Sequence, residues 1–160
     1  ISFLTPTRLI EDKALVKTPD FGVFFSRTLQ RIDQLSRQHA GGDHRAMKDI
    51  QRLQTAADRV RLVETNVEWV DFFGPSNRTG RKTPMSGFTG KAIFRARDWE
   101  ALMPWLLFGQ GIQSGKLAVK GNGVFQVETH SAKFYWDWIY QTETMKPELK
   151  NGYSSALVHG

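Results

Sequence analysis

The alternation of hydrophobic and polar residues predicts strands and helices along most of the chain. Residues 1–10 alternate apolar and polar side chains and predict a first strand, in which Pro6 marks an edge or a bend. A helix is expected next, with Thr18 as its N-cap, Pro19 at its first position and Asp20 in its first turn. Its apolar stripe has helical spacing and consists of Phe21, Phe24, Phe25, Leu29, Ile32 and Leu35.

A second helical segment follows closely and is more polar than the first. We expect the first helix to stop at Gly41 and Gly42 and Asp43 to cap the second, which runs through Ala57. Its apolar residues are spaced three apart, at Met47, Ile50 and Leu53. The pattern predicts a helix on the surface of the domain, inserted between the other elements.

The central part of the chain predicts a long hairpin. Residues 61–73 and 87–96 have strand-like patterns, and residues 74–84 between them are rich in Gly, Pro, Ser and Asn. Such residues favour turns, so the two strands are expected to pair with each other.

The last predicted elements are a helix and a strand, and they complete an order of helices and strands that is typical of one fold. The helix is expected from Trp99 to Phe108 after Asp98; Pro104 either kinks it or lies in the first turn of a helix that starts late. A strand at residues 123–128 follows. The order strand, helix, strand, strand, helix, strand predicts an α+β fold of the ferredoxin-like (RRM-like) type, a four-stranded antiparallel sheet with two packed helices. The second helical segment is then an insertion.

We expect two regions, a ferredoxin-like domain at residues 1–128 and a C-terminal extension at 129–160. The extension contains a run of aromatic residues. Two roles are open for them, stacking on RNA bases and packing within the protein, and we favour packing. Residues 146–160 have little periodicity and predict a mobile tail. The aromatic run is Phe134, Tyr135, Trp136, Trp138 and Tyr140, and the tryptophans assigned to the core of the domain are Trp69, Trp99 and Trp105.

Composition restricts the possible functions. The chain has 160 residues, a net charge of +6 and no cysteine, which excludes thiol catalysis, disulfide scaffolds and cysteine-based zinc sites. The positive charge favours an acidic partner such as nucleic acid, although a merely basic protein is the alternative. No apolar run approaches the roughly 20 residues that span a bilayer, so we expect no membrane association and a cytoplasmic location. Since residue 1 is Ile and the strand pattern starts at once, we expect a piece of a longer protein.

The segment between the last helix and the last strand is the most informative one. It combines five glycines with two lysines. Glycine lets backbone amides approach a phosphate, and lysine supplies the charge that a phosphate attracts. We therefore predict a loop that holds a polyanion; the alternative is a flexible connection with solvated lysines. The candidate contact residues are Gly109, Gly111, Gly115, Lys116, Lys120, Gly121, Asn122 and Gly123.

The histidines and carboxylates give weaker signals. His39 and His44 lie on either side of the Gly41-Gly42 break, where they form either an acid and base pair or, as we favour, two surface residues near helix ends. The carboxylates have no spacing typical of metal ligands, so we expect neither a metal nor another cofactor.

Five landmarks stand in order along the sequence. They are residues 3–9, residues 31–35 in the long helix, Gly87-Phe88-Thr89-Gly90, residues 104–109, and the glycine segments 114–116 and 121–125. Taken together, they resemble the C-terminal half of a CRISPR repeat-processing endoribonuclease of the RAMP superfamily. The resemblance covers residues 1 to about 128.

The resemblance implies a specific chemistry. Members of this family have two ferredoxin-like halves and cut repeat RNA without metal: a 2′-hydroxyl attacks the adjacent phosphate and leaves a 2′,3′-cyclic phosphate. Their catalytic histidine often lies in the first half, opposite the glycine loop of the second. This chain is then expected to hold RNA with its Gly and Lys loop, with its own catalytic residues unknown and an N-terminal half as its partner.

The hairpin supplies a second basic cluster, Arg78, Arg81 and Lys82. We interpret this cluster either as a tip that enters the groove of an RNA stem or as a solvated, disordered tip. Two other functions stay open besides the nuclease: a non-catalytic RNA-binding RAMP module, and a structural subunit of a ribonucleoprotein complex.

Overall fold

The computed structural model describes residues 1–71, 73–75 and 82–129. The chain divides into two compact units, residues 1–127 and 128–160, and the fold described below is that of the first. Its elements are β1 (Ser2–Thr7), β2 (Leu9–Glu11), β3 (Ala14–Val16), α1 (Phe21–His39), α2 (Met47–Asp58), β4 (Arg61–Val70), β5 (Phe73–Pro75), β6 (Lys82–Pro84), β7 (Gly87–Arg95), α3 (Met103–Gln110), the 3₁₀ turn η1 (Ala118–Lys120) and β8 (Phe125–Gln126).

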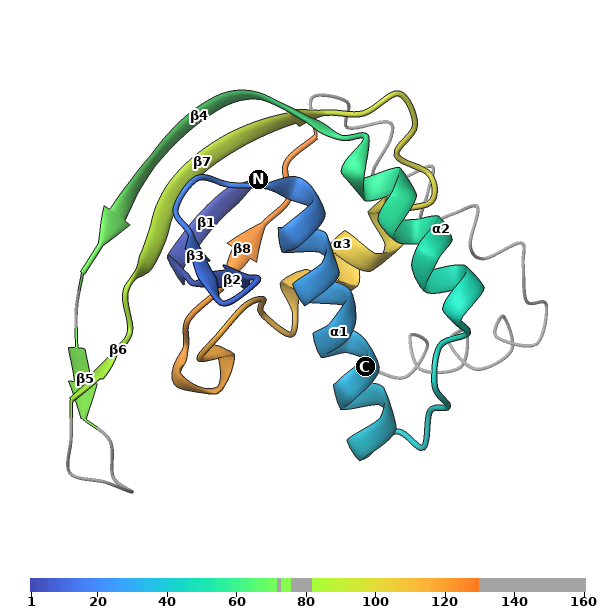
Figure 1. The fold of residues 1–160 in the computed structure, drawn as a ribbon, viewed down its shortest axis with the longest axis horizontal. Coiled ribbons are helices and arrows are strands. Elements are labelled where there is room, and N and C mark those ends of the chain that lie inside the picture. Colours follow the sequence, from blue (N-terminus) through green and yellow to red (C-terminus); the bar gives the residue numbers. More distant parts are fainter. Residues whose placement is uncertain (72, 76–81, 130–160) are drawn as a thin grey trace, which may run out of the picture. The chain divides into compact units, whose positions relative to one another are not determined.

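The main sheet has four strands in the order β4-β7-β1-β8, and every neighbouring pair is antiparallel. The helices α1, α2 and α3 lie on one side of this sheet (Figure 1). Counting only the strands of this sheet, the order along the chain is strand, helix, strand, strand, helix, strand. The predicted ferredoxin-like α+β fold is therefore confirmed, with α2 as an additional helix after α1.

The predicted long hairpin is formed by β4 and β7. Their pairing extends from Arg61 opposite Arg95 to Val70 opposite Gly87. Strand β4 is shorter than the predicted strand at residues 61–73, because the chain leaves the main sheet at Asp71 and continues in the small β5–β6 hairpin.

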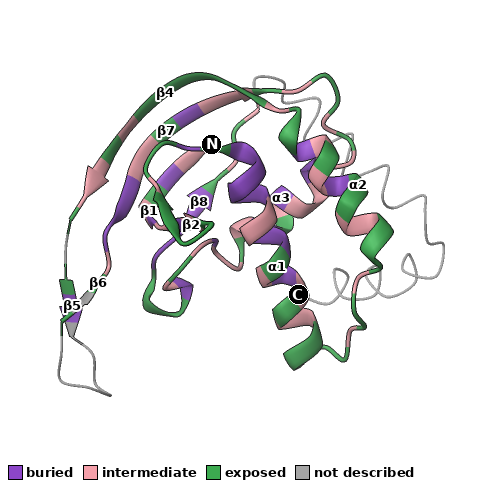
Figure 2. Ribbon diagram, viewed as in Figure 1, coloured by how far each residue is buried: buried purple, intermediate pink, exposed green. Residues whose placement is uncertain are grey.

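Four phenylalanines fasten α1 to the sheet. The ring of Phe24 on α1 packs edge to face on Phe3 of β1 at 5.4 Å and on Phe125 of β8 at 4.8 Å between centroids. Phe3 in turn packs on Phe88 of β7 at 4.9 Å. Each such aromatic pair contributes roughly 0.5–1.5 kcal/mol beyond the burial of its area. Figure 2 shows buried residues on the facing sides of α1, β1 and β7, whereas most of β4 is exposed.

The three tryptophans assigned to the core lie at its border. Trp69, Trp99 and Trp105 are partly buried and pack against the buried cluster. Trp69 keeps its polar edge at the surface, where Nε1 donates a hydrogen bond to Asp71 Oδ1 at 2.8 Å. This arrangement suits a large ring that carries one hydrogen-bond donor.

The predicted start of the first helix is wrong by a short distance. The N-cap is Asp20, whose Oδ1 accepts a hydrogen bond from the backbone N of Val23 at 2.9 Å. Thr18 and Pro19 therefore precede the helix. Asp is at least as good an N-cap as Thr, so Asp20 caps the helix two residues after the predicted start.

The end of the first helix agrees with its prediction, but the start of the second does not. Helix α1 ends directly before Gly41 and Gly42, as expected. Asp43 does not cap α2, since the N-cap position is held by Ala46 without a side-chain bond. The segment between the helices is fixed instead by Arg45, which forms a bidentate ion pair with Asp33 of α1.

The predicted first strand is divided in two. Its first part is β1, and the chain then forms the separate hairpin β2–β3. The turn uses Asp12 at φ 45° and Lys13 at φ 67°. The sequence did not predict this hairpin, because Asp-Lys lacks the glycine that usually identifies such a turn.

The structure also decides between the two alternatives for Pro104. Helix α3 starts late, at Met103, and the proline lies in its first turn, where its missing N–H costs no helical hydrogen bond. The last strand, β8, is shorter than predicted because Gly123 has φ +76° and is not extended.

We predict that Phe24→Ala lowers the free energy of unfolding by about 3–5 kcal/mol, because it removes a ring that is 0% exposed and touches two strands. Phe108→Ala, at a ring that is 62% exposed, serves as the control and should cost less than about 1 kcal/mol. Urea denaturation followed by circular dichroism measures both. Equal losses would contradict this assignment of the core.

Candidate nucleic-acid interface

The glycine loop, residues 111–124, is hydrogen-bonded to the end of β1. The backbone N of Lys116 donates to Arg8 O at 2.9 Å, and the N of Gly123 donates to Pro6 O at 3.1 Å. Thr5 adds its hydroxyl, which donates to Gly121 O at 2.8 Å. The loop is therefore a braced part of the fold and differs from the flexible connection that was the alternative.

The glycines of this loop serve its shape and its packing. Gly121 at φ +89° and Gly123 at φ +76° adopt the left-handed conformation on either side of Asn122. A Cβ on Gly123 would overlap with the carbonyl oxygen of Ser114, whereas one on Gly121 would project into open space. Gly109 lies inside α3, and a Cβ there would overlap with the side chain of Thr28.

Most amides of the loop already have acceptors inside the protein. Asn122 is buried, and its Nδ2 donates to Met85 O at 2.8 Å. The phosphate cradle of backbone amides that the sequence predicts is not formed by these groups, because the loop uses them to hold its own shape. The loop amides that donate within the protein belong to Gly111, Ile112, Gln113, Ser114, Lys116, Lys120, Gly121, Asn122, Gly123 and Val124.

The side chain of Lys116 takes part in a different arrangement, a basic cavity of about 330 Å³. Four of the residues that line it are cationic, and they come from the end of β1, from α1 and from the glycine loop. The cavity is lined by Arg8, Ile10, Arg27, Gln30, Arg31, Gln34, Gly115 and Lys116. We call it the basic cavity.

Backbone carbonyls orient two of these guanidinium groups. Arg27 donates from Nε and Nη2 to Ile10 O at 3.1 and 2.6 Å, and Arg31 donates from Nε to Ile112 O at 3.2 Å. A carbonyl fixes a guanidinium but leaves its full charge. The side chains are therefore held in place and keep N–H groups for an anionic ligand.

A third guanidinium, that of Arg8, donates a hydrogen bond from Nη1 to the backbone O of Ser86 at 3.2 Å, directly before β7. No described carboxylate forms an ion pair with a cation of the basic cavity; the ion pairs Arg45–Asp33 and Arg52–Asp49 lie elsewhere. The cavity therefore keeps an excess of positive charge.

Asp71 is the carboxylate whose electrostatics involve Arg8. Hydrogen bonds from Trp69 and then Ser86 hold the pKa of Asp71 below its usual value, and the positive charges of Lys17 and Arg8 lower it further. Asp71 is therefore ionised at neutral pH, and its main partners are neutral donors rather than the cations of the cavity.

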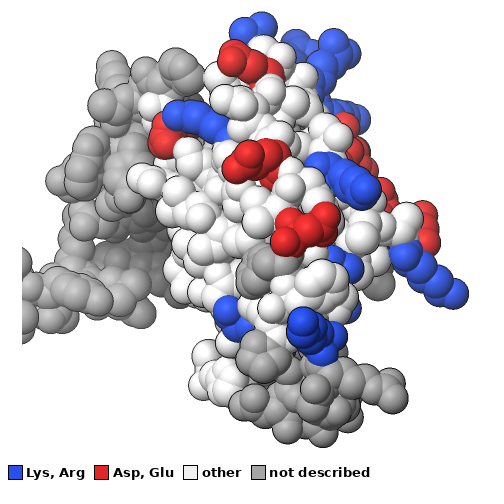
Figure 3. All heavy atoms as spheres, turned by 90° about the vertical axis from the view of Figure 1, so that its left-hand side faces the viewer, with Lys and Arg blue, Asp and Glu red and all other residues white. Residues whose placement is uncertain are grey.

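The other predicted contact residues lie elsewhere. Lys120 is exposed on η1 and Lys82 on β6, and neither lines the basic cavity. Arg78 and Arg81 lie outside the described residues. The side of the fold that carries β4 and β5 mixes acidic and basic side chains and forms no continuous basic field (Figure 3).

The two candidate histidines lie at the C-terminal end of α1, His39 in its last turn and His44 in the loop that follows. His39 is the last residue of the helix, and both it and His44 are exposed. His44 Nδ1 lies 3.0 Å from Arg37 Nη1. Neither histidine lines the basic cavity.

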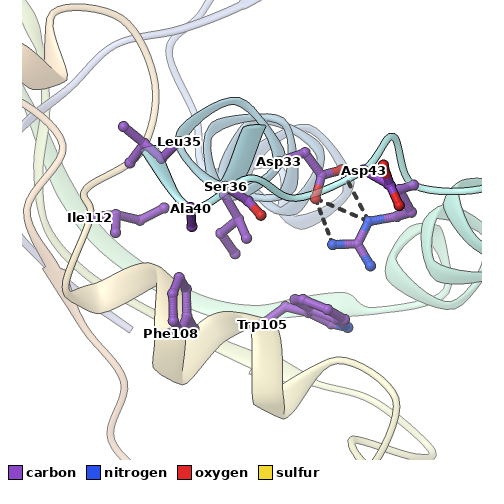
Figure 4. A pocket seen from close by; sticks show the side chains of 10 residues that line it. Asp33, Leu35, Ser36, Ala40, Asp43, Trp105, Phe108 and Ile112 are labelled. Atoms are coloured by element: carbon purple, nitrogen blue, oxygen red, sulfur yellow. Dashed lines mark hydrogen bonds and ion pairs between the residues drawn. The ribbon is translucent and has the colours of Figure 1, made fainter. Parts of the chain in front are cut away.

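A second cavity, of about 550 Å³, lies between α1 and α3 and is largely apolar. Figure 4 shows Trp105 and Phe108 opposite the α1 residues Asp33 and Ser36. The Arg45 guanidinium lies 4.0 Å from the centre of the Trp105 ring, and its ion pair with Asp33 neutralises it. This cavity lacks the unpaired positive charge that a polyanion requires.

Two kinds of feature are absent from the described part of the chain. No group of three or more His, Cys, Asp or Glu residues there could hold a metal ion. None of the described helices has the length and apolar character needed to cross a membrane.

The fold and the cavity thus define a ferredoxin-like domain with a basic site beside a glycine-rich loop. The family model of the CRISPR-associated endoribonuclease Cas6 matches residues 1–125, and the chain belongs to this family. No curated protein matches the chain.

Solved Cas6 structures share this fold. Thermus thermophilus Cas6 (TTHB231) is 18% identical over 77% of this chain and 50% of that protein, with a TM-score of 0.56. The Cas6 (TTHB231) product complex gives 17% identity over 77% of this chain and 48% of that one, with a TM-score of 0.58. The chain spans about half the length of the Cas6 structures that it matches.

We predict that two glycines of the loop differ sharply in their tolerance of alanine. Gly123→Ala should lower the free energy of unfolding by more than about 3 kcal/mol, because its Cβ meets the Ser114 backbone as well as an unfavourable φ. Gly121→Ala has the unfavourable φ alone and should cost about 1–2 kcal/mol. Thermal and urea unfolding measure both losses. A Gly123 variant as stable as the Gly121 variant would refute this account of the loop.

Proposed function

We propose that this chain is the RNA-holding half of a CRISPR repeat RNA processing endoribonuclease. Membership of the Cas6 family supports this function, and so does the length of the chain, about half that of the matched structures. The proposed partners are RNA and a second ferredoxin-like half. One of the matched Cas6 structures is a product complex, which is consistent with RNA as the ligand.

The observation that carries the proposal is the basic cavity, where Arg8, Arg27, Arg31 and Lys116 converge without a carboxylate ion pair among the described residues. Guanidinium groups match the geometry of phosphate oxygens and donate two hydrogen bonds at once. None of the described residues that line the cavity is aromatic, so it suits the sugar-phosphate backbone better than a stacked base.

The proposed chemistry needs no metal. A 2′-hydroxyl attacks the adjacent phosphorus, the bond from phosphorus to the 5′-oxygen of the next nucleotide breaks, and that oxygen takes up a proton and leaves as a 5′-hydroxyl. A 2′,3′-cyclic phosphate remains. Cations beside the reacting phosphate stabilise the negative charge that grows in the transition state, and a base must take the proton of the hydroxyl. We assign the cations to this chain and the base to the second half.

We predict that Lys116→Ala and Arg31→Ala each weaken the binding of repeat RNA about tenfold, because each removes a charged hydrogen bond to phosphate. Each should also reduce the slope of log K against log salt by about 0.7–1, the contribution of one phosphate contact. Lys48→Ala, at an exposed position on α2, is the matched control and should leave both quantities unchanged. Fluorescence anisotropy at several KCl concentrations measures them; wild-type affinity in both test variants would overturn the site.

We also predict that this chain alone binds repeat RNA without cutting it, whereas the protein with both halves cuts it in EDTA. The products should carry a 2′,3′-cyclic phosphate, which acid treatment opens and gel mobility then detects. Cleavage that requires added Mg²⁺ would refute the metal-independent mechanism. Cleavage by this chain alone would place the base within residues 1–160.

A further inference from the structure

We propose that Asn122 is a positioning residue that fixes Lys116 at the basic cavity and does not itself contact RNA. The inference rests on the function proposed above and deepens it, because it names the group that sets the geometry of the phosphate site.

The first observation is the burial of Asn122. Asn122 is 2% exposed, although the three residues before it in the loop, Val119, Lys120 and Gly121, are exposed. Its Nδ2 donates to Met85 O at 2.8 Å, and its backbone N donates to Leu117 O at 3.3 Å. A ligand on the surface therefore contacts little of this side chain. The loop, in contrast, is held by two hydrogen bonds of Asn122, one from its side chain and one from its backbone.

The second observation is that these bonds close a ring that includes the cavity. Met85 is followed by Ser86, whose O accepts from Arg8 Nη1 at 3.2 Å. The O of Arg8 accepts from the backbone N of Lys116 at 2.9 Å. Since Lys116 is followed by Leu117, the ring runs from Asn122 through Met85, Ser86, Arg8, Lys116 and Leu117 back to Asn122.

The conformation of the loop explains why such a brace is needed. Leu117 has φ 67° and Gly121 has φ 89°, so left-handed residues stand on both sides of the turn η1. A left-handed conformation is unfavourable for leucine and persists where the surroundings enforce it. The bond from Asn122 N to Leu117 O closes this turn directly behind Lys116.

The identity of the residue matters as well. The acceptor is a backbone carbonyl, so the side chain must donate, and an ionised carboxylate of the same shape has no donor. Without the brace, RNA binding must order Lys116 at the moment of contact, and the lost conformational freedom reduces affinity.

A double-mutant cycle tests the proposal with labelled repeat RNA and anisotropy at several KCl concentrations. Asn122→Ala should weaken binding about 3–10-fold and lower the salt slope, because Lys116 no longer holds its phosphate. The double variant Asn122→Ala with Lys116→Ala should bind no more weakly than Lys116→Ala alone, since both changes remove one contact.

The control is Thr28→Val, which likewise removes a buried hydrogen-bonding group: the Thr28 hydroxyl bonds to Phe24 O and Ser114 Oγ, outside the ring. It should lower the melting temperature and leave affinity and salt slope unchanged. If Asn122→Ala does not fold, Asn122→Ser replaces it in the cycle with the same expected coupling.

The outcomes separate the two proposals. Additive losses in the double variant, or an unchanged salt slope in Asn122→Ala, would overturn the positioning role while the effect of Lys116→Ala upholds the phosphate site. A Lys116→Ala variant with wild-type affinity and salt slope would overturn the phosphate site itself.

Discussion

The hydrogen bonds at the end of β1 are the constraint on which the rest of the site depends. This strand pairs with β7 and β8 on its two sides, so its position is fixed by the whole sheet. Two carbonyls at its end accept from the glycine loop, Pro6 O within the strand and Arg8 O directly after it. The loop is thus attached to one of the two central strands of the sheet, and the rigidity of the sheet extends to a segment that has little regular structure of its own.

The basic cavity arises where that strand end, α1 and the loop meet. Arg27 and Arg31 are one helical turn apart on the same face of α1, and carbonyl oxygens hold them. Carboxylates would hold them equally well but would cancel their charge. The protein instead uses neutral acceptors here and reserves its bidentate ion pair for Arg45 and Asp33, which link the loop before α2 to α1.

The sequence predicts the order of the elements well because hydrophobic periodicity reflects burial on one face. It fails where local chemistry offers two equal choices, as with Thr18 and Asp20, or no usual signal, as with the Asp12-Lys13 turn. Lys116 was a candidate from the sequence because glycines surround it. Arg27 and Arg31, which line the basic cavity with it, were not candidates, because their spacing is that of any charged helix surface and only the tertiary fold brings them to Lys116.

The glycine loop shows that glycines can have another role than the one their pattern predicts. Glycines were expected to expose amides, but Gly123 is required because a Cβ would overlap with the Ser114 backbone. The amides are consumed in holding the loop, and the charge of a lysine side chain is what the loop can offer to a ligand. A braced lysine loses little conformational entropy when a phosphate binds. The proposed reaction is a displacement at phosphorus, where small misplacements are costly, so a lysine on a held backbone is more useful there than one on a mobile loop.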